Sequence, residues 1–234
     1  MMEKIPYKIV RRNRKKTVQL VVASDNSLTV YAPRFLAERR IDEIVRIKSG
    51  WIEKRFEFNR GRKIKPLTDG QTISIAGRSF ILKICRGNSA PVTTARKLLV
   101  FVPEKVADEN VEKHLLRSLE TWGIEQAKSI LPGRVEHYAK MINRRPGKIT
   151  VKKIRSRWGS CSSVGNLNFN WRIVLAPVEI IDYVVVHELC HMIHLNHSRQ
   201  YWETVESVLP DYKKRRLWLK ENEINLHLNA QIHS

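Results

Sequence analysis

The chain has 234 residues, of which 42% are hydrophobic and 28% are charged, and such a composition is typical of a globular protein. No apolar run approaches the roughly 18 residues that a membrane span requires, so we expect neither a transmembrane helix nor a membrane partner. Forty-three Lys and Arg residues against 23 Asp and Glu residues leave a formal net charge of +20, which exceeds what a domain needs for solubility.

The excess positive charge gathers in four clusters along the sequence. A stripe of such charge would attract nucleic acid through the release of counterions, without reading its sequence. The other interpretation is solvated surface charge that has no dedicated ligand. The clusters comprise residues 11–16, 60–65, 152–157 and 213–216.

The N-terminal stretch and the cysteines bear on the cellular compartment. MMEKIPYKIVRRNRKK lacks the apolar core and the cleavage site of a secretory signal. Cys85, Cys161 and Cys190 are few, odd in number and widely spaced, which argues against a disulfide framework. We therefore expect a cytoplasmic protein with free thiols.

The first hundred residues are expected to form mainly strands, with one helix. Alternating apolar residues in 16–22 and 27–33, on either side of Ser24-Asp25-Asn26, predict a β-hairpin. Apolar residues at helical spacing from about 36 to 59 predict an amphipathic helix, with a kink at Ser49-Gly50. Further short strands are predicted at 72–75, 79–85 and 97–102.

The second part of the chain is expected to be mainly helical. Helical spacing runs from beyond Pro103 to about residue 142, and Pro132-Gly133 predicts a break into two consecutive helices. Strands at 148–154 and 167–174, a helix from 178 through the histidines, and helical pieces at 198–208 and 211–228 follow. We therefore predict an α+β fold with a β-rich region over residues 1–105 and a second region over residues 106–234.

Four of the eight histidines lie in the stretch VVVHELCHMIHLNHSRQYW, residues 184–202. Within it, His187-Glu188-Leu189-Cys190-His191 has the form H-E-x-x-H, which places two imidazoles on one helical face, where both reach a single ion. Zinc in a hydrolytic site takes three protein ligands and leaves one position for a water whose pKa falls to near 7. Glu188 would take the proton of that water and pass it to the leaving amine. The alternative is a pair of histidines that only form hydrogen bonds.

The third ligand has several candidates. His197 stands ten residues after His187, as the third histidine does in H-E-x-x-H-x-x-G-x-x-H. His194 occupies the glycine position of that pattern, so we expect the turn at Asn196, which tolerates a left-handed backbone. We favour His197, while His194, Glu203 and Glu206 remain alternatives. Three ligands on one straight helix would spread over about 10 Å, too far to share an ion comfortably.

A Gly/Ser-rich loop and an alternating strand precede the histidines, in RWGSCSSVGNLNFNWR. We interpret this strand either as an edge strand that pairs with an extended peptide beside the metal or as an ordinary amphipathic strand. Cys161 is interpreted either as a ligand at the open position of the metal or, preferably, as a small loop residue near the cleft, whereas Cys190 is expected only to pack. The candidates for contact with the substrate or an oxyanion are Asn168, Asn170, Arg157 and Tyr201. For Tyr201 the alternative, which we favour, is a core aromatic at the start of a helix.

Residues 157–202, RWGSCSSVGNLNFNWRIVLAPVEIIDYVVVHELCHMIHLNHSRQYW, resemble the signature of the YgjP-like predicted metal-dependent hydrolases, which are related in pattern to the SprT-like and WLM metallopeptidases. The resemblance implies a zincin-like metallopeptidase core of helices against a small sheet. It also implies His187, His191 and His197 as zinc ligands, Glu188 as general base, and a peptide or protein substrate. DNA-bound proteins are substrates of the SprT-like and WLM relatives, and the charge of +20 is compatible with such a role.

Two other functions stay open beside a zinc-dependent peptidase. One is a nucleic-acid-binding protein with a structural zinc site, which would have four protein ligands and no open position. The other is a degenerate scaffold that binds partners without hydrolysis, and Glu188 argues against it.

Overall fold

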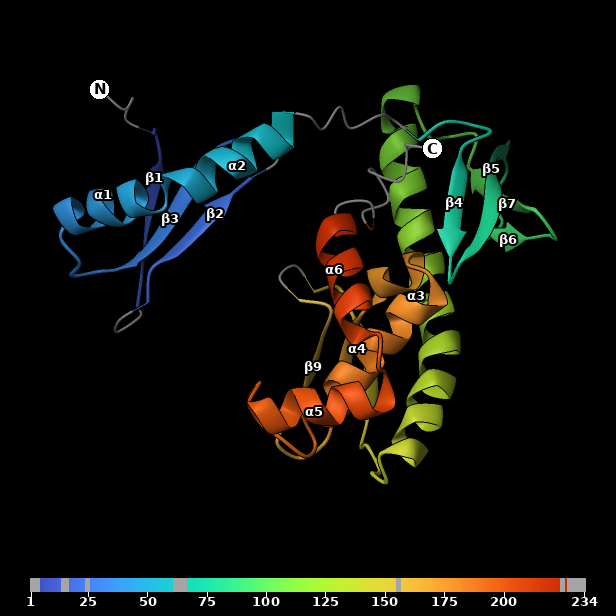
Figure 1. Ribbon diagram of the computed structural model, residues 1–234. Coiled ribbons are helices and arrows are strands. Elements are labelled where there is room, and N and C mark those ends of the chain that lie inside the picture. Colours follow the sequence, from blue (N-terminus) through green and yellow to red (C-terminus); the bar gives the residue numbers. More distant parts are fainter. Residues whose placement is uncertain are drawn as a thin grey trace. The chain divides into compact units, whose positions relative to one another are not determined.

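The computed structural model describes residues 5–13, 17–23, 26–60, 67–154, 157–223 and 226 (Figure 1). The fold is α+β, as the sequence predicts, and the chain divides into two compact units, Met1–Ile64 and Lys65–Ser234. Each unit has a hydrophobic core of its own. The sequence predicts a division after residue 105, but the strands between 72 and 102 share their core with the helices that follow them.

The first unit is a three-stranded sheet and two helices. Strands β2 and β3 form the antiparallel pair of the predicted hairpin, although Ser24 and Asp25 of its turn lie outside the described residues. Strand β1, which pairs in parallel with β3, was not predicted because its two apolar residues are adjacent and do not alternate with polar ones. The elements are β1 (Lys8–Arg12), β2 (Gln19–Val22), β3 (Leu28–Pro33), α1 (Glu38–Ile47) and α2 (Ser49–Arg60).

A four-stranded sheet opens the second unit, in the order β4-β5-β7-β6. Its three longer strands lie where strands are predicted, whereas the two-residue strand β6 was not predicted. A turn with positive φ at Ala76 and Gly77 joins β4 to β5, and the Ala76 N–H donates to the carbonyl of Val174 at 2.7 Å. The strands are β4 (Thr72–Ile75), β5 (Arg78–Arg86), β6 (Val92–Thr93) and β7 (Lys97–Val102).

Helix α3 (Asp108–Met141) is one continuous helix of 34 residues. The predicted break at Pro132 is therefore wrong. Proline removes one helix hydrogen bond and costs about 3 kcal/mol in a helix interior, but Pro132 is exposed, and the buried face continues across it through Leu131 and Val135. Burial of that face in the core outweighs the local cost.

A second, three-stranded sheet lies next in the chain, in the order β8-β10-β9. Strand β10 pairs in parallel with β8 and antiparallel with β9. It is therefore the central strand, which excludes the edge-strand interpretation and leaves that of an ordinary amphipathic strand. The short strand β9, which the Gly/Ser-rich composition concealed, lies at one edge. The predicted strand 167–174 also ends early, in a 3-10 helix. These elements are β8 (Ile149–Lys152), β9 (Gly159–Cys161), β10 (Leu167–Asn170) and η1 (Trp171–Leu175).

Helix α4 (Val178–Cys190) is buried along most of its length. It contacts α3, β9, α5 (Arg199–Val208) and α6 (Tyr212–Asn222), and Figure 1 shows it beside the long helix α3. The ion pair of Arg134 with Asp182, at 2.6 Å, ties α3 to α4. No helix within the described residues combines the length and apolar character that crossing a membrane requires.

Candidate metal centre

The C-terminal end of α4 carries two of the predicted histidines. His187 lies in its last turn and His191 is the residue that caps it. Because four residues complete about one helical turn, both rings lie on the same face. The rest of α4 is apolar and buried on nearly all sides, as expected of a helix inside a core.

A tight turn brings His197 back to the end of α4. The N–H groups of Ile193 and His194 both donate to the Cys190 carbonyl at 3.0 Å, and the Ser198 hydroxyl accepts from the Tyr201 N–H to cap α5. The left-handed residue expected at Asn196 is absent: the described non-glycine residues with positive φ are Asn26, Ala76 and Asn143. Consecutive turns therefore replace the glycine of the H-E-x-x-H-x-x-G-x-x-H pattern.

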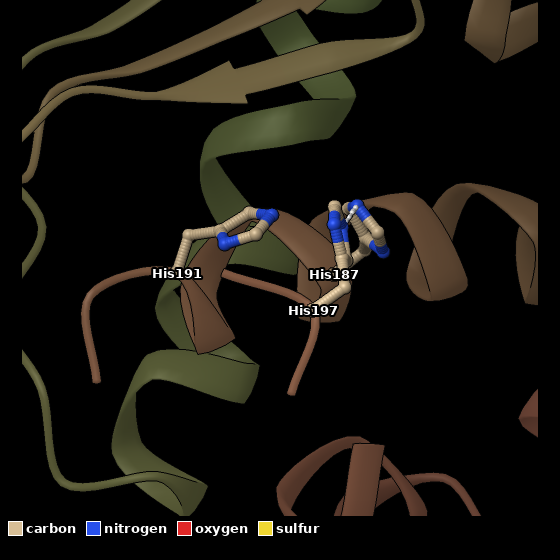
Figure 2. Close-up of side chains that lie close together, drawn as sticks. All are labelled: His187, His191 and His197. Carbon is tan, nitrogen blue, oxygen red and sulfur yellow. Dashed lines mark hydrogen bonds between the residues drawn. The ribbon is translucent and has the colours of Figure 1, made fainter. Parts of the chain in front are cut away.

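The structure brings His187, His191 and His197 together (Figure 2). Each offers one ring nitrogen, and these three atoms lie within 4.8 Å of one another. The Nε2 atoms of His187 and His197 are 3.1 Å apart, and Nδ1 of His187 is buried without a hydrogen-bond partner. Three converging nitrogen donors, one of them on a ring that the protein leaves incompletely satisfied, fit a divalent ion.

The protonation state of the rings also favours binding of a metal ion. Burial, together with the neighbouring His191 and His197, lowers the pKa of His187 to about 3. Burial also lowers the pKa of His197. Both rings are therefore neutral at pH 7, which is the form of imidazole that binds metal.

Residues around the cluster hold the histidines in place. Nδ1 of His191 lies 3.0 Å from the carbonyl of His194, which directs the other ring nitrogen toward the cluster. The hydroxyl of Tyr201 donates to the carbonyl of His187 at 2.9 Å, and its ring stacks on His191 with centroids 4.7 Å apart. Tyr201 is fully buried, so its hydroxyl stabilises the backbone of α4, a role that the sequence did not reveal.

The three alternative ligands have other partners. Nε2 of His194 lies 3.1 Å from the hydroxyl of Thr204. Glu203 pairs with Arg199, and Glu206 pairs with Lys213. None of the three belongs to the histidine cluster.

Glu188 is a buried carboxyl beside the cluster, with 5% of its surface exposed. It packs on Gly159 of β9, where a Cβ atom would lie 2.6 Å from both its Cγ and its Oε1. Burial raises the pKa of Glu188 to about 7, against the opposing effects of the Arg157 charge and a hydrogen bond from the Cys161 N–H. Sequence reasoning missed Gly159, and only its place in the motif RWGSC could have indicated it.

The predicted substrate-binding residues differ in how open they are. Arg157 is exposed, and Asn168 is half-buried with its amide 3.3 Å from the Ser160 hydroxyl. Asn170 is buried, and its amide nitrogen donates to the carbonyls of Ile154 and Arg157. Asn170 thus shapes the segment before β9.

Among the described residues, neither Cys161 nor Cys190 forms a hydrogen bond with the histidines of the cluster. Cys161 lies in β9, where its thiol donates to the Ser162 carbonyl at 3.4 Å. Burial and the charge of Glu188 raise the pKa of the Cys161 thiol, which disfavours the thiolate that binds metals. Cys190 is fully buried and packs in the core, as predicted.

Comparisons with known proteins agree with the predicted resemblance. The family model described as YgjP-like, metallopeptidase domain, matches residues 16–222, and no curated protein matches the chain. The metallopeptidase zymogen of Pyrococcus abyssi abylysin is 23% identical, with a TM-score of 0.36, over 39% of this chain and 94% of that one. The zymogen of Methanocaldococcus jannaschii jannalysin is 19% identical, with a TM-score of 0.37, over 40% and 97%. Because the family model spans most of its length, the chain belongs to the YgjP-like metallopeptidase family and is a metal-dependent hydrolase.

Proposed function

We propose that the protein is a zinc-dependent peptidase in which His187, His191 and His197 hold the ion and Glu188 is the general base. The observation that carries the proposal is the convergence of three imidazole nitrogens within 4.8 Å beside a buried carboxyl. Three imidazole ligands suit zinc. A structural zinc site would use four protein ligands, and in the described part of the chain the cluster has three.

The residues of the chain divide the chemistry among them. A divalent ion bound here would acidify a coordinated water and polarise the carbonyl of the substrate. Glu188 accepts the proton of the attacking water and delivers it to the leaving amine. Gly159 allows the carboxylate to lie directly against β9, and the Cys161 N–H orients it. Tyr201 holds the backbone of His187.

The edge strand β9 is the proposed place for the substrate backbone. Among the described strands β9 pairs only with β10, and Gly159 within it contacts Glu188. An extended peptide added to the other side of β9 would bring its carbonyl groups close to that carboxylate. Arg157 and Asn168 remain candidates for contact with this peptide, whereas Asn170 and Tyr201 are used within the protein.

Two variants and one control test the proposal. We expect Glu188→Gln to keep the metal and to lose hydrolysis by about a hundredfold or more, because a positioned base contributes at least that much. His187→Ala should lose both metal and hydrolysis, whereas His194→Ala should keep both, because His194 lies outside the cluster. Metal analysis of the purified proteins and cleavage of a quenched fluorescent peptide measure the outcomes. Full activity of Glu188→Gln would contradict the role of that carboxyl.

We also propose that the unit Met1–Ile64 binds nucleic acid without sequence specificity. It holds 17 Lys and Arg residues against 7 Asp and Glu residues, about half of the excess charge of the chain. Part of the predicted cluster 11–16, and most of the cluster 60–65, lie outside the described residues. Exposed cations of this unit include Arg34, Arg39 and Arg46.

The salt dependence of binding to duplex DNA tests this second proposal. If about four phosphates are neutralised, affinity should fall about a hundredfold between roughly 50 and 200 mM salt. Replacing Arg34 and Arg39 by Gln should reduce the slope against salt, whereas the same change at Lys105 and Lys113 of the other unit should leave it unaltered. Fluorescence anisotropy measures the affinity, and absence of binding at low salt would rule the proposal out.

A further inference from the structure

Arg216 of α6 is an exposed cation beside the histidine cluster. Its guanidinium carbon lies 4.7 Å from the ring centroid of Trp202. The Trp202 ring in turn stacks on His197, with centroids 5.6 Å apart and planes 23° apart. Arg216 therefore borders the candidate metal centre.

Stacking on Trp202 restrains the side chain of Arg216 and leaves its N–H groups available for a ligand. A guanidinium over an aromatic ring uses its face, so the N–H groups at its edge stay free to bind a carboxylate with two hydrogen bonds. Two neighbouring cations on α6 are already paired, Lys213 with Glu206 and Arg215 with Asp211. No carboxylate of the described residues forms an ion pair with Arg216.

The surroundings of the cluster carry a positive balance. Arg216 lies near His197 through Trp202, and the charge of Arg157 acts on Glu188 beside the cluster. A bound divalent ion would add positive charge, so the site would favour an anionic substrate.

We propose that Arg216 binds a carboxylate of the peptide substrate near the scissile bond, and thus makes the protein selective for acidic peptides. This inference rests on the proposed peptidase function. The carboxylate can belong to an Asp or Glu side chain or to the C-terminus of the peptide, since both present the same two oxygens to the guanidinium.

The test begins with the zinc-loaded full chain and a peptide mixture obtained by digesting a denatured protein. Mass spectrometry identifies the bonds that are cleaved. A cleaved sequence is then made in four forms, with Glu or Gln at one position near the bond and with a free or an amidated C-terminus. We expect kcat/KM to be about tenfold higher for the form that carries the recognised carboxylate, mainly through KM, and to approach that of the neutral form as salt is raised.

Variants of α6 assign the preference to Arg216. Arg216→Gln should remove the tenfold preference and leave cleavage of the neutral, amidated peptide within about twofold of the original. Lys214→Gln removes the same charge two residues earlier, on the other side of the helix, and should keep the preference. Arg216→Lys should keep part of it, because lysine retains the charge without the two-pronged geometry.

A binding measurement separates recognition from hydrolysis. In the Glu188→Gln background, anisotropy of labelled peptides should show the same preference for the carboxylate and its loss on adding Arg216→Gln. Preference that survives amidation identifies an acidic side chain, and preference that amidation removes identifies the C-terminus. Equal preference with and without Arg216 would overturn the inference alone. If the unmodified protein cleaves no peptide, the proposed peptidase function fails with it.

Discussion

Gly159 and Glu188 meet at a distance that leaves no room for a side chain on the glycine. A Cβ atom at residue 159 would lie 2.6 Å from Oε1 of Glu188 and 2.8 Å from its Cδ, closer than non-bonded carbon and oxygen atoms approach. The carboxylate is buried, so it cannot turn away without moving β9 or the end of α4. The position of the proposed base therefore depends on residue 159 having no side chain.

We predict that Gly159→Ala lowers kcat at least tenfold while zinc content stays unchanged, because the substitution displaces Glu188 but none of the three histidines. A displacement of about 1 Å in a reacting group can cost about a hundredfold in rate. Peptide cleavage and metal analysis measure the two effects. Gly133→Ala in α3, where nothing lies within 4 Å of the added atom, is the matched control and should keep full activity. Loss of zinc in Gly159→Ala would contradict the assignment.

At the same scale, the sequence predicts some of the site and misses the rest for a physical reason. His187, Glu188 and His191 follow from helical geometry alone, because their spacing is local. The place of His197 in the cluster is predicted by its spacing from His187, although the turn that brings it there lacks the left-handed residue expected at Asn196. The contacts of Gly159 and Tyr201 join segments distant from one another in the sequence, and no local pattern reveals them.

Among the elements, prediction succeeds where periodicity is strong and fails where packing decides. Strands β4 and β7 agree with the predicted residues because apolar and polar residues alternate in β4 and a short apolar run forms β7. Helix α3 continues through Pro132 because its buried face packs in the core on both sides of the proline, and this burial stabilises a single helix. The order β8-β10-β9 is a property of pairing between strands, so the sequence of β10 left both an edge strand and an ordinary amphipathic strand open, and the structure has β9 at the edge.

The elements that support the site are joined by one strong contact. Asp182 of α4 is buried and receives two hydrogen bonds of 2.6 Å from Arg134 of α3. A buried carboxylate needs such a partner, because desolvation without one costs several kcal/mol. The two-pronged pair fixes α4 along α3 one turn before His187, and it thus contributes to the position of the histidines.

For the molecule as a whole, the two units differ in what they contain. Their cores share no residue, and all three histidines of the cluster belong to the unit Lys65–Ser234. The unit Met1–Ile64 has a small core around Leu28, Val30, Ile41 and Ile52 and a large share of the positive charge. A metal bound to the cluster should therefore stabilise one unit and not the other.

We predict that scanning calorimetry resolves two unfolding transitions and that zinc raises the temperature of only one. Binding to the folded state at a free zinc concentration about 100 times Kd adds about 2.7 kcal/mol. In a unit of 150 to 250 residues this corresponds to a rise of roughly 5 to 10 °C. A chelator should reverse the rise, and His187→Ala should abolish it while leaving the other transition in place. An equal rise in His187→Ala would place the bound metal outside the histidine cluster, because that variant lacks one of the three converging nitrogens.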